Sequence, residues 1–228
     1  MAIKKQDVRR NPLAEWVGAA WRFIQAHQTV ILAVAVVLAI GASGAGVYWW
    51  HWQRQEEEAS RLLGDALTAM RSEQPASPQS ASNPEEATKM FQEVVKQHPK
   101  TGSAEEALIA LGNMQYGVGK IDEALGSFNQ YMATFPRGRF ILEAGLGKAY
   151  AQEVKRDFDG AARTLSTTLD HEKNDPLAGE AYMSLARIYE EMKKPEDAMR
   201  VYGQVVEKYP GTRWGQQALM RMTDLKSK

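Results

Sequence analysis

The sequence predicts an all-α protein: a single N-terminal transmembrane helix, then an α-solenoid of about four helix pairs and a C-terminal capping helix. Three observations support this fold class. One segment near the N-terminus is apolar and free of charge, alanines recur every 37 residues in the remaining chain, and no segment has the pattern of a convincing β-strand.

The predicted transmembrane helix spans residues 29–50. These 22 residues carry no formal charge, and at 1.5 Å per residue a helix of this length crosses a hydrocarbon core of about 30 Å. A buried core helix is one alternative, and a cleavable signal peptide is another. Against cleavage stand the 28 residues that precede the segment and the aromatic run Val47–Trp50 that follows its small residues, so we expect an uncleaved anchor.

The flanks of this segment predict its orientation. Five basic residues precede it, whereas Arg54 and Arg61 after it are offset by the acidic run Glu56–Glu58. Basic flanks stay in the cytoplasm, so residues 1–28 are expected to be a cytoplasmic basic, interfacial amphipathic segment. Residues 51–228 would then form a periplasmic domain, and the protein would be a single-pass protein of a bacterial inner membrane. The basic residues before the segment are Lys4, Lys5, Arg9, Arg10 and Arg22.

Small residues stand four apart within the apolar segment, as at Ala35 and Ala39 and at Gly41 and Ala45. Such rows allow two membrane helices to approach closely, although small residues are common in membrane helices generally. The small residues therefore indicate either contact with another membrane helix or simply the ordinary composition of a membrane helix.

The rest of the chain repeats with a period of 37 residues. Ala87, Ala124, Ala161 and Ala198 share this spacing, and a bulky residue stands four positions after each of them. Three units close with proline, in the segments 98–102, 135–139 and 209–213, whereas the third unit lacks this proline at Lys173. The first helix of each unit carries a Leu-Gly or Leu-Ala step that allows close helix contact. A regular period of this length indicates stacked helix pairs.

These residues resemble the tetratricopeptide repeat, whose small–large–small spacing and terminal proline they match over about residues 57–212. The segment from Thr212 to Leu225 is expected to be the capping helix. The first unit is interrupted by the Ser- and Pro-rich stretch 72–84, which is expected to be an exposed loop. We predict a helix before this loop as part of the first repeat; the alternative is a linker with the domain beginning at Pro84.

Composition and motifs argue against catalysis. Lys and Arg together number 28, as do Asp and Glu, so no overall field favours nucleic acid. The chain contains no cysteine, its four histidines have no metal-ligand spacing, and no glycine-rich loop follows a strand. We therefore expect no enzyme activity, cofactor, metal or small-molecule substrate, and partners that are proteins.

The predicted binding surface is the concave groove that the first helices of such solenoids line. The residues that follow each Leu-Gly or Leu-Ala step form a column there, with an amide and two cations that could bind a peptide backbone or a carboxylate. The alternative is an ordinary solvated face. The column is Asp65, Asn113, Lys148 and Arg187, bordered by Tyr116 and Met183.

The order of parts resembles the bacterial ancillary subunit of the Sec translocon, a single-pass protein with a periplasmic tetratricopeptide domain. That resemblance implies contact with the translocon through the membrane helix, and transfer of emerging secreted proteins to periplasmic chaperones. The alternative is a cell-envelope organiser of the Tol-Pal-associated or outer-membrane-assembly type, which the proline-rich repeat ends also resemble. Those proteins usually carry a cleaved signal or a lipoprotein cysteine, and this chain has no cysteine.

Overall fold

A computed structural model describes residues 16–17, 21, 23–71, 84–171 and 176–227. The chain forms two compact units, Met1–Arg54 and Gln55–Lys228. The described residues are helical throughout, joined by short turns and without a strand, so the predicted all-α fold is confirmed.

The first unit contains the N-terminal part of α2 (Gln28–Arg71), and by length and composition this is the one helix in the described part of the chain that could cross a membrane. Its apolar side chains are exposed, as for Leu32 (67%) and Ile40 (68%). A core helix would bury such residues, so their exposure favours a membrane helix over a soluble core helix. The basic residues before Trp16 lie outside the described residues, and the orientation of the helix stays a prediction.

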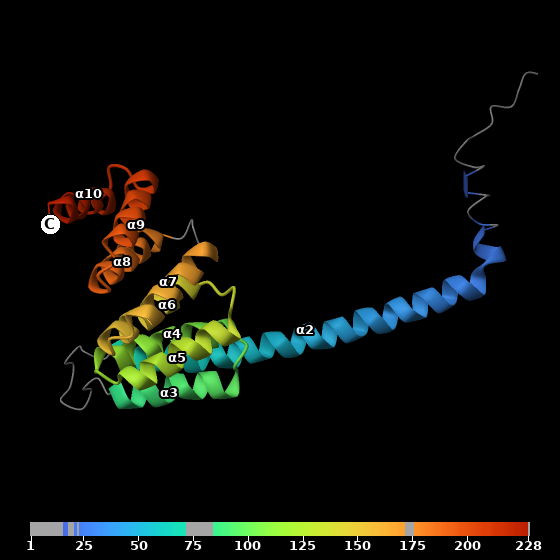
Figure 1. The fold of residues 1–228 in the computed structure, drawn as a ribbon. Helices are drawn as coiled ribbons and strands as arrows, with labels where there is room; N and C mark the ends of the chain where they lie inside the picture. Colours follow the sequence, from blue (N-terminus) through green and yellow to red (C-terminus); the bar gives the residue numbers. More distant parts are fainter. Residues whose placement is uncertain (1–15, 18–20, 22, 72–83, 172–175, 228) are drawn as a thin grey trace, which may run out of the picture. The chain divides into compact units, whose positions relative to one another are not determined.

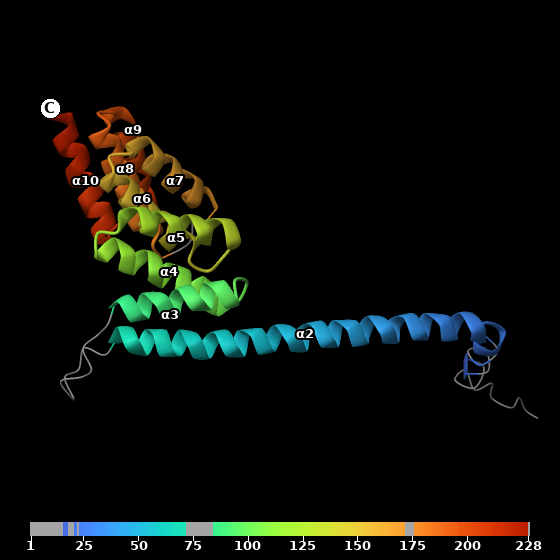
Figure 2. The ribbon, with the colours of Figure 1, turned by 90° about the horizontal axis from the view of Figure 1, so that it is seen from below.

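The second unit consists of stacked helix pairs (Figures 1 and 2). The last part of α2 pairs with α3 (Pro84–Gln97), where Ala59, Leu63 and Ala66 are buried in one cluster with Phe91. The first repeat therefore includes the helix before the predicted loop. Residues 72–83 of the predicted loop 72–84 lie outside the described residues, whereas Pro84 is not in a loop but is the first residue of α3.

Three further helix pairs and a single helix follow. Each helix packs on the next along the chain, and the first helices of neighbouring pairs also contact each other. The pairs are α4 (Gly102–Gly117) with α5 (Ile121–Thr134), α6 (Ile141–Val154) with α7 (Phe158–His171), and α8 (Ala178–Glu191) with α9 (Pro195–Lys208); α10 (Arg213–Lys226) is the capping helix.

The four alanines that recur every 37 residues lie at contacts between helices, as the period predicts. Ala87, Ala124, Ala161 and Ala198 are all completely buried. Phe128, four residues after Ala124, is also completely buried, and a Cβ atom at Gly112 would lie 2.5 Å from its Cε1 atom. A Cβ atom at Gly147 would overlap the same ring. The Leu-Gly steps of α4 and α6 therefore admit one aromatic ring between two repeats.

The segments that contain proline end the second helices and begin the next repeat. After Pro99 and Pro210, a threonine two residues later caps the following helix, because the hydroxyls of Thr101 and Thr212 accept backbone N–H groups at 3.1 and 3.3 Å. The sequence of the third unit has Lys173 where the other units have this proline, and Lys173 lies outside the described residues. The solenoid thus places the first helices side by side, so that together they form one surface.

Candidate protein-binding groove

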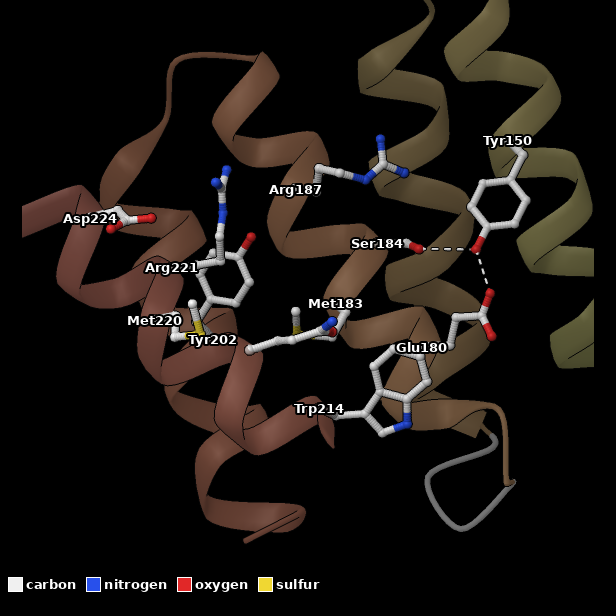
Figure 3. Close-up of a pocket in the computed structure, with 11 residues that line it drawn as sticks. Tyr150, Glu180, Met183, Ser184, Arg187, Tyr202, Trp214, Met220, Arg221 and Asp224 are labelled. Carbon is white, nitrogen blue, oxygen red and sulfur yellow. Dashed lines mark hydrogen bonds between the residues drawn. The ribbon is translucent and has the colours of Figure 1, made fainter. Parts of the chain in front are cut away.

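The first helices form one continuous face because α4 contacts α6, α6 contacts α8, and α8 contacts α10. At the C-terminal end this face contains a cleft of about 670 Å³, drawn in Figure 3. The volume lies within the range of about 300–1,000 Å³ that is usual for ligand pockets. Its lining comes from α6, α8, α9 and α10: Tyr150, Glu180, Met183, Ser184, Arg187, Tyr202, Trp214, Gln217, Met220, Arg221 and Asp224.

Two methionines and an indole supply the apolar part of the cleft. Met183 is half-buried on α8, whereas Met220 on α10 is 68% exposed. Trp214, the second residue of α10, packs over Gly179, where a Cβ atom would lie 2.6 Å from the indole Cδ1. Methionine adapts its shape to different apolar partners, so this lining suits an extended apolar segment better than one rigid ligand.

Tyr150 on α6 links the α6–α7 pair to the α8–α9 pair at the edge of the cleft. Its hydroxyl donates a hydrogen bond of 2.8 Å to Glu180 Oε1 and lies 3.2 Å from Ser184 Oγ. Burial raises the pKa of Tyr150 to about 12, with the Glu180 carboxylate adding to the shift. The phenol is therefore protonated at neutral pH, and it donates its hydrogen bond to Glu180 without bringing a charge.

Both arginines of the cleft are paired with glutamates on a neighbouring first helix. Arg187 donates to the two oxygens of Glu153 at 2.6 and 3.0 Å, and Arg221 donates to the two oxygens of Glu190 at 3.2 and 2.7 Å. Tyr202 also donates to Glu190 at 2.6 Å. These bidentate pairs connect α6 to α8 and α8 to α10, and they fix the spacing of the helices that form the cleft.

The structure brings together only part of the predicted column. Met183 and Arg187 line the cleft, whereas Asn113, Tyr116 and Lys148 do not. Asn113 is exposed on α4 and its amide donates to Glu143 Oε1 of α6 at 3.0 Å. Tyr116 is 36% exposed on the same helix, and burial lowers the pKa of Lys148 on α6. The binding role of these residues stays a prediction.

Sequence reasoning did not assign the capping-helix residues Trp214, Met220 and Arg221 to the groove. The capping helix was predicted, but it has no helix pair of its own and so falls outside the repeat phase. Its apolar residues were the available signal. Among the described residues, no group of three or more His, Asp and Glu side chains could hold a metal ion.

Comparisons with known proteins agree with the repeat fold. A family model described as a tetratricopeptide repeat-like domain matches residues 21–135, and one described as a tetratricopeptide repeat matches residues 180–212. Neither is a catalytic family, and repeat folds of this kind are generally non-catalytic scaffolds for protein interaction. No curated protein sequence matches the chain.

Solved structures with the same fold include three from different organisms. PilF of Pseudomonas aeruginosa is 14% identical with a TM-score of 0.56, over 76% of this chain and 69% of PilF. MamA from Desulfovibrio magneticus is 17% identical with a TM-score of 0.53, over 74% of this chain and 93% of MamA. A putative kinesin light chain of Podosopora anserina is 15% identical with a TM-score of 0.53, over 78% of this chain and 85% of the other.

At these identities the solved structures support the fold alone. The first family model, in contrast, covers half of the chain, from before the apolar helix to the end of α5. The repeat period, the four stacked helix pairs and this match together place the chain in the tetratricopeptide repeat-like domain family.

Proposed function

We propose that this protein is a membrane-anchored interaction scaffold and an ancillary subunit of the Sec translocon. It binds segments of secreted proteins as they emerge from the channel and passes them to periplasmic chaperones. One observation supports the proposal most directly. The same chain contains an exposed apolar helix and a repeat domain with an open, methionine-lined cleft. The family model begins at residue 21 and so includes the apolar helix.

The proposed topology places residues 1–28 in the cytoplasm, residues 29–50 in the membrane and residues 51–228 in the periplasm. The asymmetry of basic residues supports it. Because the chain contains no cysteine, single cysteines report topology cleanly. In intact spheroplasts we expect a membrane-impermeant maleimide to label Lys193→Cys and not Lys5→Cys, and the reverse pattern would refute this topology.

The cleft fits the binding of many different client segments. Emerging chains expose apolar side chains before they fold, and such segments differ in sequence. A surface of methionines and aromatic rings adapts to this variety, whereas a rigid pocket would select one partner. Binding at the cleft would keep an unfolded segment from aggregating until a chaperone takes it.

Photo-crosslinking in living cells tests the role at the translocon. A photoreactive residue is placed in turn at Ala39 in the apolar helix and at Asn113, Lys148 and Gln217 on the groove side. We expect adducts to translocon subunits from Ala39, and adducts to secreted chains or chaperones from at least one groove position. Adducts confined to envelope or division proteins would instead support the cell-envelope organiser and refute the translocon assignment.

A further inference from the structure

We propose that the cleft between α6, α8 and α10 selects apolar segments that are flanked by lysine or arginine, and disfavours acidic ones. This inference rests on the proposed function, since it names the class of segment that the same cleft takes. It differs from the sequence expectation that Arg187, together with Asn113 and Lys148, binds a peptide backbone or a carboxylate. Three features of the cleft lead to it.

The basic groups of the cleft are already neutralised. The Arg187 guanidinium is held by both carboxylate oxygens of Glu153, and the Arg221 guanidinium by both oxygens of Glu190. A ligand carboxylate would have to displace a bidentate partner from an equally well-placed site. The arginines therefore have little affinity left for an anionic ligand.

Among the described residues, the acidic groups of the cleft lack such cationic partners. Glu180 accepts its hydrogen bond from the neutral phenol of Tyr150, and no described lysine or arginine forms an ion pair with it. Asp224 is exposed on α10, and its carboxylate makes no hydrogen bond or ion pair with another described residue. Because each arginine is matched by a glutamate that lies outside the lining, Glu180 and Asp224 are the lining charges that remain available to a cationic ligand.

The two acids flank the apolar centre. In Figure 3, Glu180 and Asp224 lie on opposite sides of the cleft, and Met183 lies between them. They come from different helices, α8 and α10. A segment whose apolar side chains contact the methionines can therefore place a basic residue near an acid at each end. Complementary charges at the rim discriminate between ligands more than they add to total affinity.

The test uses the full chain in neutral-lipid nanodiscs and three fluorescent ten-residue peptides. The peptides share one apolar centre and differ in their flanks, which are lysine, serine or glutamate. We expect the lysine peptide to bind about fivefold more tightly than the serine peptide at low salt, because two exposed charge pairs contribute modestly. The glutamate peptide should bind most weakly, and the differences should shrink in 0.5 M salt, where the Debye length is only about 3–8 Å.

The double variant Glu180→Gln and Asp224→Asn tests whether these acids set the preference. The amide oxygen of the introduced glutamine can still accept the hydrogen bond of Tyr150, so the cleft keeps its shape, and the lysine preference should disappear. Glu207→Gln, on the exposed surface of α9 and outside the lining, is the matched control and should leave the preference unchanged.

Three results would overturn the inference. Equal binding of the three peptides that is weakened by Met220→Ser would refute the charge preference while leaving apolar binding at the cleft intact. Loss of the preference in the Glu207 control as well as in the double variant would show that the two cleft acids are not its source. Absence of binding by every peptide would overturn the inference and the proposed use of the cleft together.

Discussion

The ring of Phe128 fits between helices only because two positions that face it are glycines. The ring is completely buried, and it lies against Gly112 of α4 and Gly147 of α6. Alanine is a better helix former than glycine by about 1 kcal/mol, so an ordinary helix would favour it at both positions. Here the space is occupied by the ring, and packing takes precedence over helix propensity.

Gly112→Ala should therefore lower the free energy of unfolding. Forcing a methyl group against a fully buried ring costs about 1–3 kcal/mol. Gly126→Ala in α5 is the matched control, because nothing lies within 4 Å of the position its Cβ would take and only the gain in helix propensity remains. Urea denaturation followed by circular dichroism compares the two. If both substitutions stabilised the protein equally, the ring would not be confined as described.

Tyr150 and Tyr202 predict how stability depends on pH above neutrality. Burial raises the pKa of each to about 12, and hydrogen bonds to Glu180 and Glu190 add to the shift. An unfolded tyrosine titrates near pH 10, so between about pH 10 and 12 the unfolded chain releases protons that the folded chain retains. The contribution of these two phenols to the free energy of unfolding is fully present below about pH 10 and is lost as the pH rises through about 12.

The double variant Tyr150→Phe and Tyr202→Phe should weaken this dependence. Between pH 9 and pH 11 the urea midpoint of the unmodified protein should fall by more than that of the double variant. The comparison removes the contribution of lysines, which titrate in both proteins. Identical slopes in the two proteins would contradict the account of these phenols.

At the scale of elements, the turns within helix pairs share one backbone conformation. Gly119, Arg156 and Lys193 are 37 residues apart, and all three have positive φ angles of 76°, 61° and 57°. Glycine adopts this conformation freely, whereas other residues incur a cost of about 1–2 kcal/mol. Two of the three turns therefore carry local strain that the packing of the helix pairs maintains.

Lys193→Gly should accordingly stabilise the protein by about 0.5–1 kcal/mol, which is the relief of strain less the added entropy of the unfolded chain. Gly119→Ala at the equivalent turn should destabilise it. Thermal unfolding by calorimetry measures both. Destabilisation by Lys193→Gly would mean that the lysine side chain contributes more than its backbone costs.

The start of α4 depends on a side chain from α2. Both carboxylate oxygens of Glu56 accept hydrogen bonds there: from the backbone N–H of Gly102 at 2.7 Å, and from the N–H and hydroxyl of Ser103 at 3.0 and 2.8 Å. An anion at a helix N-terminus satisfies free donors and interacts favourably with the helix dipole. The acidic run Glu56–Glu58 stands out in the sequence only as a charge offset beside the apolar segment, and the pattern does not reveal the contacts that Glu56 makes with α4.

Glu56→Ala should lower the free energy of unfolding by about 1–2 kcal/mol, since helix-capping interactions have this magnitude. Glu57→Ala, at the exposed neighbouring position, should change it by less than about 0.5 kcal/mol. Chemical denaturation compares the two variants. An equal effect of both would show that the contacts of Glu56 contribute nothing beyond surface charge.

For the whole molecule, the sequence predicted the architecture because a 37-residue period reports how each unit packs on the next. Alanine positions, closing prolines and the interrupted first repeat all follow from that period. It could not report which charges pair between repeats. The partners of Arg187 and Arg221 lie 34 and 31 residues earlier in the chain, a spacing that differs from the period and depends on how the helices stack.

The repeat phase places Met183 and Arg187 in the groove but does not reveal the side of the cleft that α10 contributes. That side belongs to the end of the array and not to any repeating unit. Trp214, Met220 and Asp224 therefore carry no repeat signal, and only the three-dimensional arrangement brings them near Met183.

The central claim is that client proteins bind in the cleft while the protein is anchored in the membrane. Photo-crosslinking of the full chain in living cells from Gln217, which lines the cleft, and from Glu207, which is exposed on α9, tests it most directly. The account predicts protein adducts from Gln217, few from Glu207, and loss of the Gln217 adducts when Met220 is replaced by Glu. Equal adducts from both positions, or adducts from Glu207 alone, would contradict it.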